Sequence, residues 1–252
     1  MAEPVSLIPD WPAPAHVKLV STTRNGGCSF PPYESFNLAL HTRDDAANVT
    51  KNRAKLMQYF HLPSAPVWLN QVHGPRVVSL DGLADTSKVF DADASWTRQE
   101  NTVCAVLTAD CLPVFITDIK GSVVAIAHAG WRGLLAGVIT ETIKSLNLKR
   151  QDILVWLGPA IGPEAFVVGS DVAALFGEKQ RYFLSAFAED STGDWRCDLY
   201  QLARIELSHL GIEQVYGGDF CTYTDSGQFY SYRRDGENTG RQAHCIWLSR
   251  QY

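Results

Sequence analysis

The chain has 252 residues, of which 46% are hydrophobic, and its formal net charge is −5. This length and composition suffice for a large buried core, and because no linker or repeat divides the sequence, we expect one domain over residues 1–252. The mild negative charge excludes the strongly basic footprint of a nucleic-acid binder. No apolar run approaches roughly 18 residues and the N-terminus lacks a signal-peptide pattern, so we expect a cytoplasmic protein without a membrane partner.

Apolar periodicity predicts strands and helices in mixed order along the chain. In chain order we expect a strand at 16–22, a helix at 46–60, strands at 66–72, 76–80, 103–109, 114–117 and 122–127, a helix at 134–146, a strand at 152–157, helices at 171–176 and 198–210, and strands at 228–232 and 244–248. Several strands are apolar throughout, which is typical of burial on both faces. The irregular order predicts an α+β layered sandwich rather than a regularly wound βαβ sheet.

Three segments each offer one soft, metal-competent side chain beside an apolar run. They are His73 in NQVHG, Cys111 in TADCLPV and His128 in AIAHAGWRG. Two imidazoles and one thiolate fill three of the four positions of tetrahedral zinc, which leaves one position open, as in catalytic sites. A single histidine is more often a hydrogen-bonded core residue than a ligand, so this prediction depends on the three segments together. The other cysteines are interpreted as buried thiols rather than disulfides.

Local geometry supports this grouping. Cys111 and His128 flank an expected turn at 118–121, so a hairpin would bring them side by side. Strand alternation places Gln71 and His73 on the same face of an extended segment. Metal-bound histidines usually need an orienting hydrogen-bond partner, and Gln71 is therefore our candidate for that role.

Two groups of arginines are candidates for binding an anion. A glycine-rich turn and a predicted helix start follow His128, and free N–H groups there, together with Arg132, would favour a negative charge. Arg233, Arg234 and Arg241 form a second cluster. A solvated loop with internal ion pairs explains that cluster equally well. No Walker glycine loop and no GxGxxG motif is present, so the anion is not a nucleotide bound in either of those ways.

These segments, together with LGPAIG at 157–162 and YRRDG at 232–236, closely resemble the laccase-domain family. This family was first described as multicopper polyphenol oxidases and later as purine nucleoside phosphorylases with adenosine deaminase activity. The resemblance, which runs from about residue 22 to 248, implies one domain of α/β/β/α layers with mixed sheets. It also implies zinc held by His73, Cys111 and His128 as the catalytic residues. Its expected substrates are adenosine, inosine or methylthioadenosine with phosphate, while the oligomeric state stays open.

The resemblance adds Asn37 and His41, in the segment NLALH, to the candidate substrate-binding residues. After this motif the family usually has a glycine before an acidic pair, whereas this chain has Arg43. Arg43 would either add a positive charge near the entrance of the site or point to solvent, and we favour the second interpretation.

Deamination would require an acid/base group close to the metal, and three aspartates are candidates for this role. Asp110 precedes Cys111, but strand alternation would send the two side chains to opposite faces. Asp91 and Asp93 would share one face of an extended segment, although a hydrogen-bonded turn is the simpler interpretation of that pair.

Several alternative functions stay open. Seven histidines and no His-x-His pair are too few for a trinuclear copper cluster with a blue-copper site, so a copper polyphenol oxidase is least favoured, although one N₂S site would still bind copper in vitro. A metal-free hydrolase with Cys111 as nucleophile is the alternative mechanism. One bacterial branch of the family is described as a peptidoglycan editing factor that removes a wrong amino acid from a UDP-muramoyl precursor. A structural zinc site is disfavoured because it would want a fourth ligand.

Overall fold

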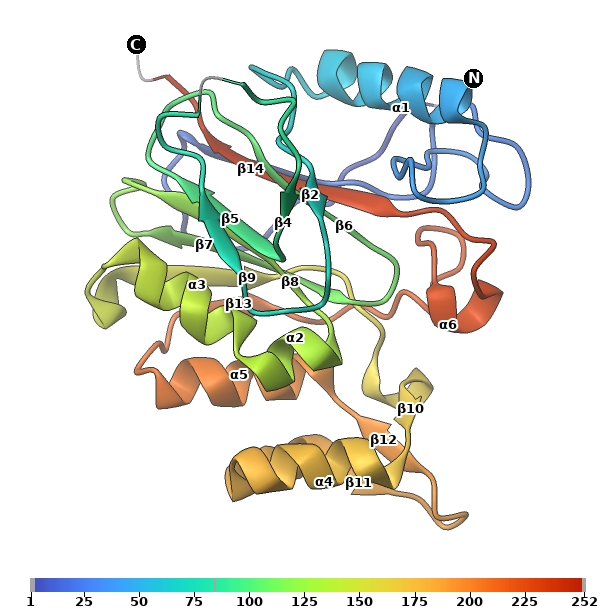
Figure 1. The fold of residues 1–252 in the computed structure, drawn as a ribbon, viewed down its shortest axis with the longest axis vertical. Coiled ribbons are helices and arrows are strands. Elements are labelled where there is room, and N and C mark those ends of the chain that lie inside the picture. The colour runs from blue at the N-terminus through green and yellow to red at the C-terminus, as the bar shows by residue number, and fades with distance from the viewer. Residues whose placement is uncertain (1–2, 84, 251–252) are drawn as a thin grey trace.

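Two β-sheets lie face to face at the centre of the structure, and helices cover their outer faces (Figure 1). The computed structural model describes residues 3–83 and 85–250. The first sheet has the order β1–β14–β6 and is antiparallel throughout, and the second is mixed, with the order β13–β9–β7–β8–β5–β3. The predicted α+β layered architecture is confirmed.

The strands of these two sheets have the following bounds. The first sheet contains β1 (Val17–Ser21), β14 (Gln242–Leu248) and β6 (Cys104–Thr108). The second contains β13 (Val215–Gly217), β9 (Ile153–Leu157), β7 (Leu112–Asp118), β8 (Val124–Ala129), β5 (Ala94–Thr97) and β3 (Val77–Ser79). Two smaller sheets pair β2 (Leu69–Asn70) with β4 (Phe90–Asp91), and β10 (Val167–Val168) and β11 (Phe187–Glu189) with β12 (Trp195–Cys197).

Alternation along the strands builds a separate core on each side of the first sheet. Val106 of β6 packs in the core between the two sheets, together with Phe115 of β7 and Ile126 of β8. The neighbouring Leu107 belongs instead to the core beneath α1 (Ala46–Tyr59), which also contains Leu56 of that helix. Successive side chains of a strand point to opposite faces of the sheet, so neighbouring residues of β6 enter different cores. The candidate site lies at one end of the core between the two sheets.

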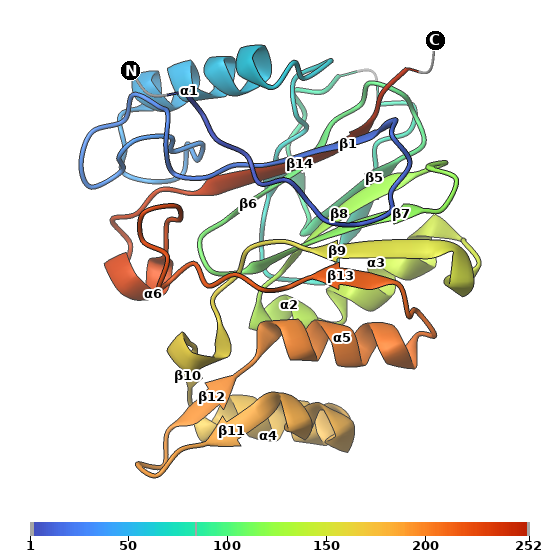
Figure 2. The ribbon, with the colours of Figure 1, turned by 180° about the vertical axis from the view of Figure 1, so that it is seen from behind.

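Helices cover the outer face of the second sheet (Figure 2). They are α2 (Trp131–Ala136), α3 (Val138–Leu146) and α5 (Leu199–His209), with α4 (Ser170–Lys179) and the β10–β12–β11 sheet beyond them. The sequence predicted one helix at 134–146, but Gly137 adopts φ 89° and divides that segment into α2 and α3. Glu206 of α5 then accepts a hydrogen bond from the Thr140 N–H (3.0 Å) in the first turn of α3.

One predicted strand is wrong. Residues 228–232 form no strand, and the last of them begins the short helix α6 (Tyr232–Asp235). The backbone N–H and C=O of Tyr230 bond instead to the side-chain amide of Gln242 (3.0 and 3.2 Å), which satisfies both groups without a neighbouring strand. Short 3₁₀ helices occupy Arg150–Asp152, Pro163–Ala165 and Arg181–Ala186.

Two further features concern the chain as a whole. All six cysteines have free thiols; Cys104, Cys197 and Cys245 are buried as predicted, whereas Cys28 and Cys221 are half-buried. Within the described residues, no helix combines the length and apolar character that a membrane crossing requires.

Candidate metal centre

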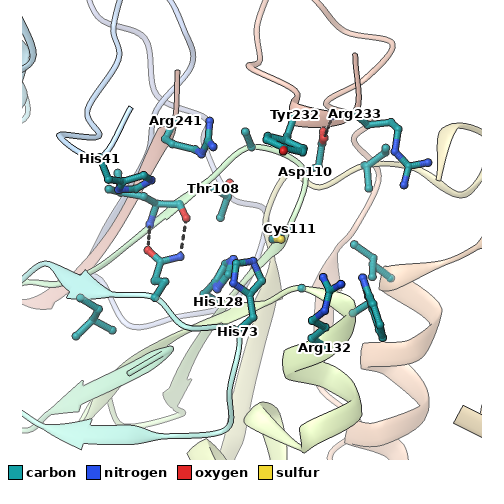
Figure 3. A pocket seen from close by; sticks show the side chains of 18 of the residues that line it. His41, His73, Thr108, Asp110, Cys111, His128, Arg132, Tyr232, Arg233 and Arg241 are labelled. Carbon is teal, nitrogen blue, oxygen red and sulfur yellow. Dashed lines mark hydrogen bonds between the residues drawn. The ribbon is translucent and has the colours of Figure 1, made fainter. Parts of the chain in front are cut away.

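The structure brings His73, Cys111 and His128 together at one end of the inter-sheet layer (Figure 3). Their ligand atoms lie within 4.8 Å of one another, and the two imidazole rings meet edge to face with 4.8 Å between their centroids. Among residues 3–83 and 85–250, this is the only group of three or more His, Cys, Asp or Glu side chains spaced to hold a metal ion.

The predicted hairpin explains how two of the three side chains meet. Strands β7 and β8 pair in antiparallel register, with Pro113 opposite His128 and Leu112 opposite Ala129. Cys111 directly precedes β7, so the hairpin places its sulfur beside the His128 ring. The register thus confirms the prediction that the chain turns back at 118–121.

Strand alternation fails at two of the other positions where the sequence analysis used it. His73 and Asp110 adopt left-handed φ values of 59° and 91°, so neither lies in a regular strand. Asp110 lines the same pocket as Cys111, which contradicts its predicted place on the opposite face. Its carboxylate accepts hydrogen bonds from the Thr222 hydroxyl (2.6 Å) and the Arg233 backbone N–H (2.7 Å). Those bonds hold the turn that presents Cys111.

Asp93, rather than Gln71, forms hydrogen bonds to two residues of the His73, Cys111 and His128 group. The buried Asp93 carboxylate accepts hydrogen bonds from the His128 Nδ1 (2.9 Å), the His73 N–H (2.9 Å) and the Gly74 N–H (2.8 Å). The Gln71 amide instead donates to and accepts from the Leu107 backbone, at 2.8 Å each, so the predicted contact with His73 is wrong. In the sequence Asp93 appears only as one of two carboxylates in the segment FDADA, and this pattern does not indicate its hydrogen bonds to residues 72–74 and 128.

The charges of the cluster suit a metal ion. Burial opposes ionisation of the Cys111 thiol, but the charge and hydrogen bond of His128, with a smaller contribution from His73, lower its pKa. Burial also opposes the charge on His128, while the charge of Cys111 and the hydrogen bond that His128 donates to Asp93 raise the pKa of that imidazole. The thiolate is the form that binds metals, and a bound ion would replace the proton held between Cys111 and His128. Because Asp93 holds Nδ1 of His128, the other ring nitrogen is left for the ion.

Gly130 is needed for steric reasons at this centre. A Cβ atom at this position would lie 2.8 Å from the Cys111 sulfur and 3.4 Å from Cδ2 of His73. We expect Gly130→Ala to lower the affinity for Zn²⁺ by about 10-fold or more, because the added methyl group displaces the sulfur. Zinc titration with a competing chelator measures this affinity. Gly133→Ala is the matched control, since its nearest contact would be an ordinary 3.4 Å, and equal losses in both variants would contradict the steric explanation.

The metal centre lies in a cavity of about 720 Å³. Five of the other candidate substrate-binding residues line it: His41, Gln71, Arg132, Arg233 and Arg241. Thr108 also lines it and was not predicted from the sequence; its hydroxyl bonds to Nε2 of the buried His244 (2.8 Å). No ion pair joins any of the three lining arginines to a carboxylate of the described residues.

Two candidates lie outside the cavity and have structural roles. The Arg234 guanidinium donates to the carbonyl groups of Thr222, Tyr223 and Phe229 and pairs with Asp235. The buried Asn37 amide accepts a hydrogen bond from the Arg241 backbone N–H (3.0 Å), so it supports a lining residue without lining the cavity itself.

Arg43 and the N-terminus of α2 were two further candidate features of the site. Arg43 pairs with Glu237 at 3.1 Å, and both side chains are exposed, in agreement with the solvent-facing interpretation. The helix that follows His128 begins at Trp131 and is only six residues long, so we assign no anion site to its N-terminus.

Comparison with known proteins identifies the family. Residues 18–249 match the family model described as multi-copper polyphenol oxidoreductase laccase. The purine nucleoside phosphorylase YfiH of Escherichia coli K12 is 50% identical over 243 residues, covering 96% of this chain and 98% of that protein. A purine nucleoside phosphorylase of Pseudomonas aeruginosa is 48% identical, with the same coverage.

Solved structures agree with this assignment. A crystal structure of a Neisseria meningitidis protein has a TM-score of 0.92 and 43% identity, and covers 99% of this chain and 100% of its own. That of YlmD from Geobacillus stearothermophilus has a TM-score of 0.85 and 28% identity, with coverage of 94% and 93%. The chain belongs to the multi-copper polyphenol oxidoreductase laccase family.

Proposed function

We propose that this protein is a zinc-dependent purine nucleoside phosphorylase that acts on adenosine, inosine and methylthioadenosine. The observation that carries the proposal is one cavity that combines a His-Cys-His group with three arginines that form no ion pair with a carboxylate of the described residues. Relatives that are about half identical over nearly their whole length carry the name purine nucleoside phosphorylase. A site for nucleoside and phosphate needs both an enclosed pocket and a cationic wall.

His73, Cys111 and His128 would hold the zinc ion and are the catalytic residues of this proposal. A bound zinc ion supplies Lewis-acid stabilisation of developing negative charge. Copper would bind the same donors in vitro, but one three-ligand group does not make a multicopper centre. Asp93 fixes the ring of His128, and Gly130 leaves room for the sulfur of Cys111.

The reaction determines what the rest of the cavity must do. Phosphorolysis breaks the bond between C1′ of the ribose and N9 of the purine and forms a bond from C1′ to a phosphate oxygen. The purine leaves with the bonding electrons and takes up a proton. The lining arginines would bind the phosphate dianion through charge-assisted hydrogen bonds, which also hold it in line with C1′.

Deamination of adenosine is a second activity that we propose for the same centre. Three protein ligands leave one position of tetrahedral zinc for water or substrate, which is the arrangement of hydrolytic zinc sites. Asp110 is not our acid/base candidate, because both of its carboxylate oxygens accept hydrogen bonds from Thr222 and Arg233.

A product assay tests the proposal. Zinc-loaded protein is incubated with adenosine, with and without phosphate, and adenine, inosine, hypoxanthine and ribose 1-phosphate are separated by chromatography. We expect adenine and ribose 1-phosphate to form only when phosphate is present, and inosine to form with or without phosphate. Cys111→Ala should form none of these products. Wild-type turnover no higher than that of Cys111→Ala would contradict the proposal and favour hydrolysis of a UDP-muramoyl precursor.

A further inference from the structure

The charged groups of the cavity lie on two sides of the metal centre. Figure 3 shows His41 and Arg241 on one side of Cys111 and His128, and Arg132 and Arg233 on the other. Arg241 is half-buried, whereas His41, Arg132 and Arg233 are exposed, and the arginines on the two sides have different neighbours.

Arg241 is held rigidly and has donors to spare. Its backbone N–H donates to Asn37, and Nη1 of its guanidinium donates to the carbonyl groups of Thr239 (2.8 Å) and Gly240 (2.9 Å). The Nε–H and the two N–H groups of Nη2 make no hydrogen bond to any described residue, so three of the five guanidinium donors are available. The Tyr232 ring, 5.7 Å from the guanidinium carbon, limits its movement further.

The positive charge of Arg241 is only partly balanced. Burial lowers its pKa, and although Cys111 and Asp110 act in the opposite direction, burial prevails. The nearby His41 has a lowered pKa as well, from burial first and then from the charges of Arg241 and Arg53, and this shift favours the neutral imidazole. A neutral imidazole can donate to an anion without adding a further charge to this side of the cavity.

The other side of the cavity is lined by two aromatic rings, of which Trp131 is half-buried and Phe166 is buried. The guanidinium of Arg132 lies over the Trp131 ring at 4.3 Å, and that of Arg233 lies over the Phe166 ring at 5.1 Å. Both arginines are exposed, and Arg233 donates to the Val167 carbonyl (2.6 Å). Aromatic rings and guanidinium planes are the surfaces on which purine bases stack.

We propose that the phosphate dianion binds to Arg241 beside His41, and that the purine ring binds across the metal centre against Trp131 and Phe166. The proposal rests on the proposed function for its reaction, but the anion site at Arg241 is defined by its own contacts. The free edge of the Arg241 guanidinium can form two parallel hydrogen bonds to one phosphate group. The ribose would then span the metal centre between the two subsites.

The two halves are tested separately, with inorganic phosphate alone and with adenine alone as probes, by calorimetric titration of the zinc-loaded protein. Neither probe reacts by itself, so both measurements report binding. Arg241→Gln is expected to weaken phosphate binding by about 10- to 100-fold and to leave adenine binding unchanged. Trp131→Leu is expected to weaken adenine binding by about 10-fold and to leave phosphate binding unchanged. Arg43→Gln, which alters an arginine outside the cavity, is the matched control and should change neither.

Arg241→Lys tests the site should Arg241→Gln not fold. Lysine keeps the positive charge but lacks the paired N–H donors of the guanidinium, so we expect a loss of phosphate affinity smaller than that in Arg241→Gln. Phosphate binding that survives in Arg241→Gln and falls in Arg132→Gln or Arg233→Gln would overturn the assignment, as would a wild-type protein that does not bind phosphate. Binding through Arg241 without formation of ribose 1-phosphate would refute the proposed reaction alone, and a phosphate group of a larger substrate would then occupy the site.

Discussion

Removing the metal with a chelator is expected to slow phosphorolysis by about 1,000-fold, and added Zn²⁺ should restore the wild-type rate. Lewis-acid stabilisation by zinc is worth several kcal/mol, and each 1.36 kcal/mol corresponds to a factor of ten in rate. Zn²⁺ should not restore activity to Cys111→Ala, which retains only the two imidazoles of the centre. The measurement is the rate of ribose 1-phosphate formation against the zinc content of the protein.

The same experiment separates the metal mechanism from a thiol nucleophile. A half-buried thiol outside the cavity, Cys28, provides the control, and Cys28→Ala should retain activity and its response to Zn²⁺. Activity that survives the chelator but disappears on alkylation of Cys111 would refute the zinc mechanism and establish covalent catalysis by that sulfur.

Asp93→Asn is expected to weaken Zn²⁺ binding by about 10- to 100-fold and to lower the free energy of unfolding by about 2–3 kcal/mol. One oxygen of Asp93 accepts from both the His73 N–H and the His128 ring, and the other accepts from the backbone N–H groups of Val72 and Gly74. An asparagine NH₂ group cannot accept a hydrogen bond. In Asp93→Asn it would therefore lie against buried N–H groups that have lost their acceptor. Zinc titration and urea unfolding of the metal-free protein measure the two effects separately.

Asp91→Asn is the matched control for this prediction. Asp91 lies two positions away and is exposed, and its carboxylate bonds to the Asn70 side chain. We expect its substitution to change neither quantity. Unchanged zinc affinity in Asp93→Asn would show that the ring of His128 is held in place by packing alone.

The hairpin was predictable because it depends on a local pattern. Two apolar runs on either side of a short turn predict paired strands, and this pairing alone brings Cys111 and His128 together. The position of His73 beside them depends on contacts between distant segments, which apolar periodicity does not encode. His73 entered the candidate set through its residue type and through the resemblance to a known family, and not through a predicted spatial contact.

The failed predictions share a physical cause. Alternation assumes extended backbone, but His73 and Asp110 have positive φ values because Asp93 and Thr222, from distant segments, hold those turns. The helix expected at 134–146 breaks where Gly137 takes a conformation that favours glycine. In each case a tertiary contact or a single glycine determines the backbone conformation, although the apolar periodicity continues through that position.

Cys111 sits where the chain crosses from one central sheet to the other, and this limits how the protein can be re-engineered. Strand β6 ends at Thr108 and β7 begins at Leu112, so only residues 109–111 connect the two sheets there. The hydrogen bonds of Asp110 to Thr222 and Arg233 restrict the movement of this short connection. Repacking the inter-sheet core, for example at Phe115, would shift the sulfur along with the sheets. A displacement of about 1 Å costs about 100-fold in rate. Thermostabilising redesign therefore has more freedom beneath the outer helices than between the sheets.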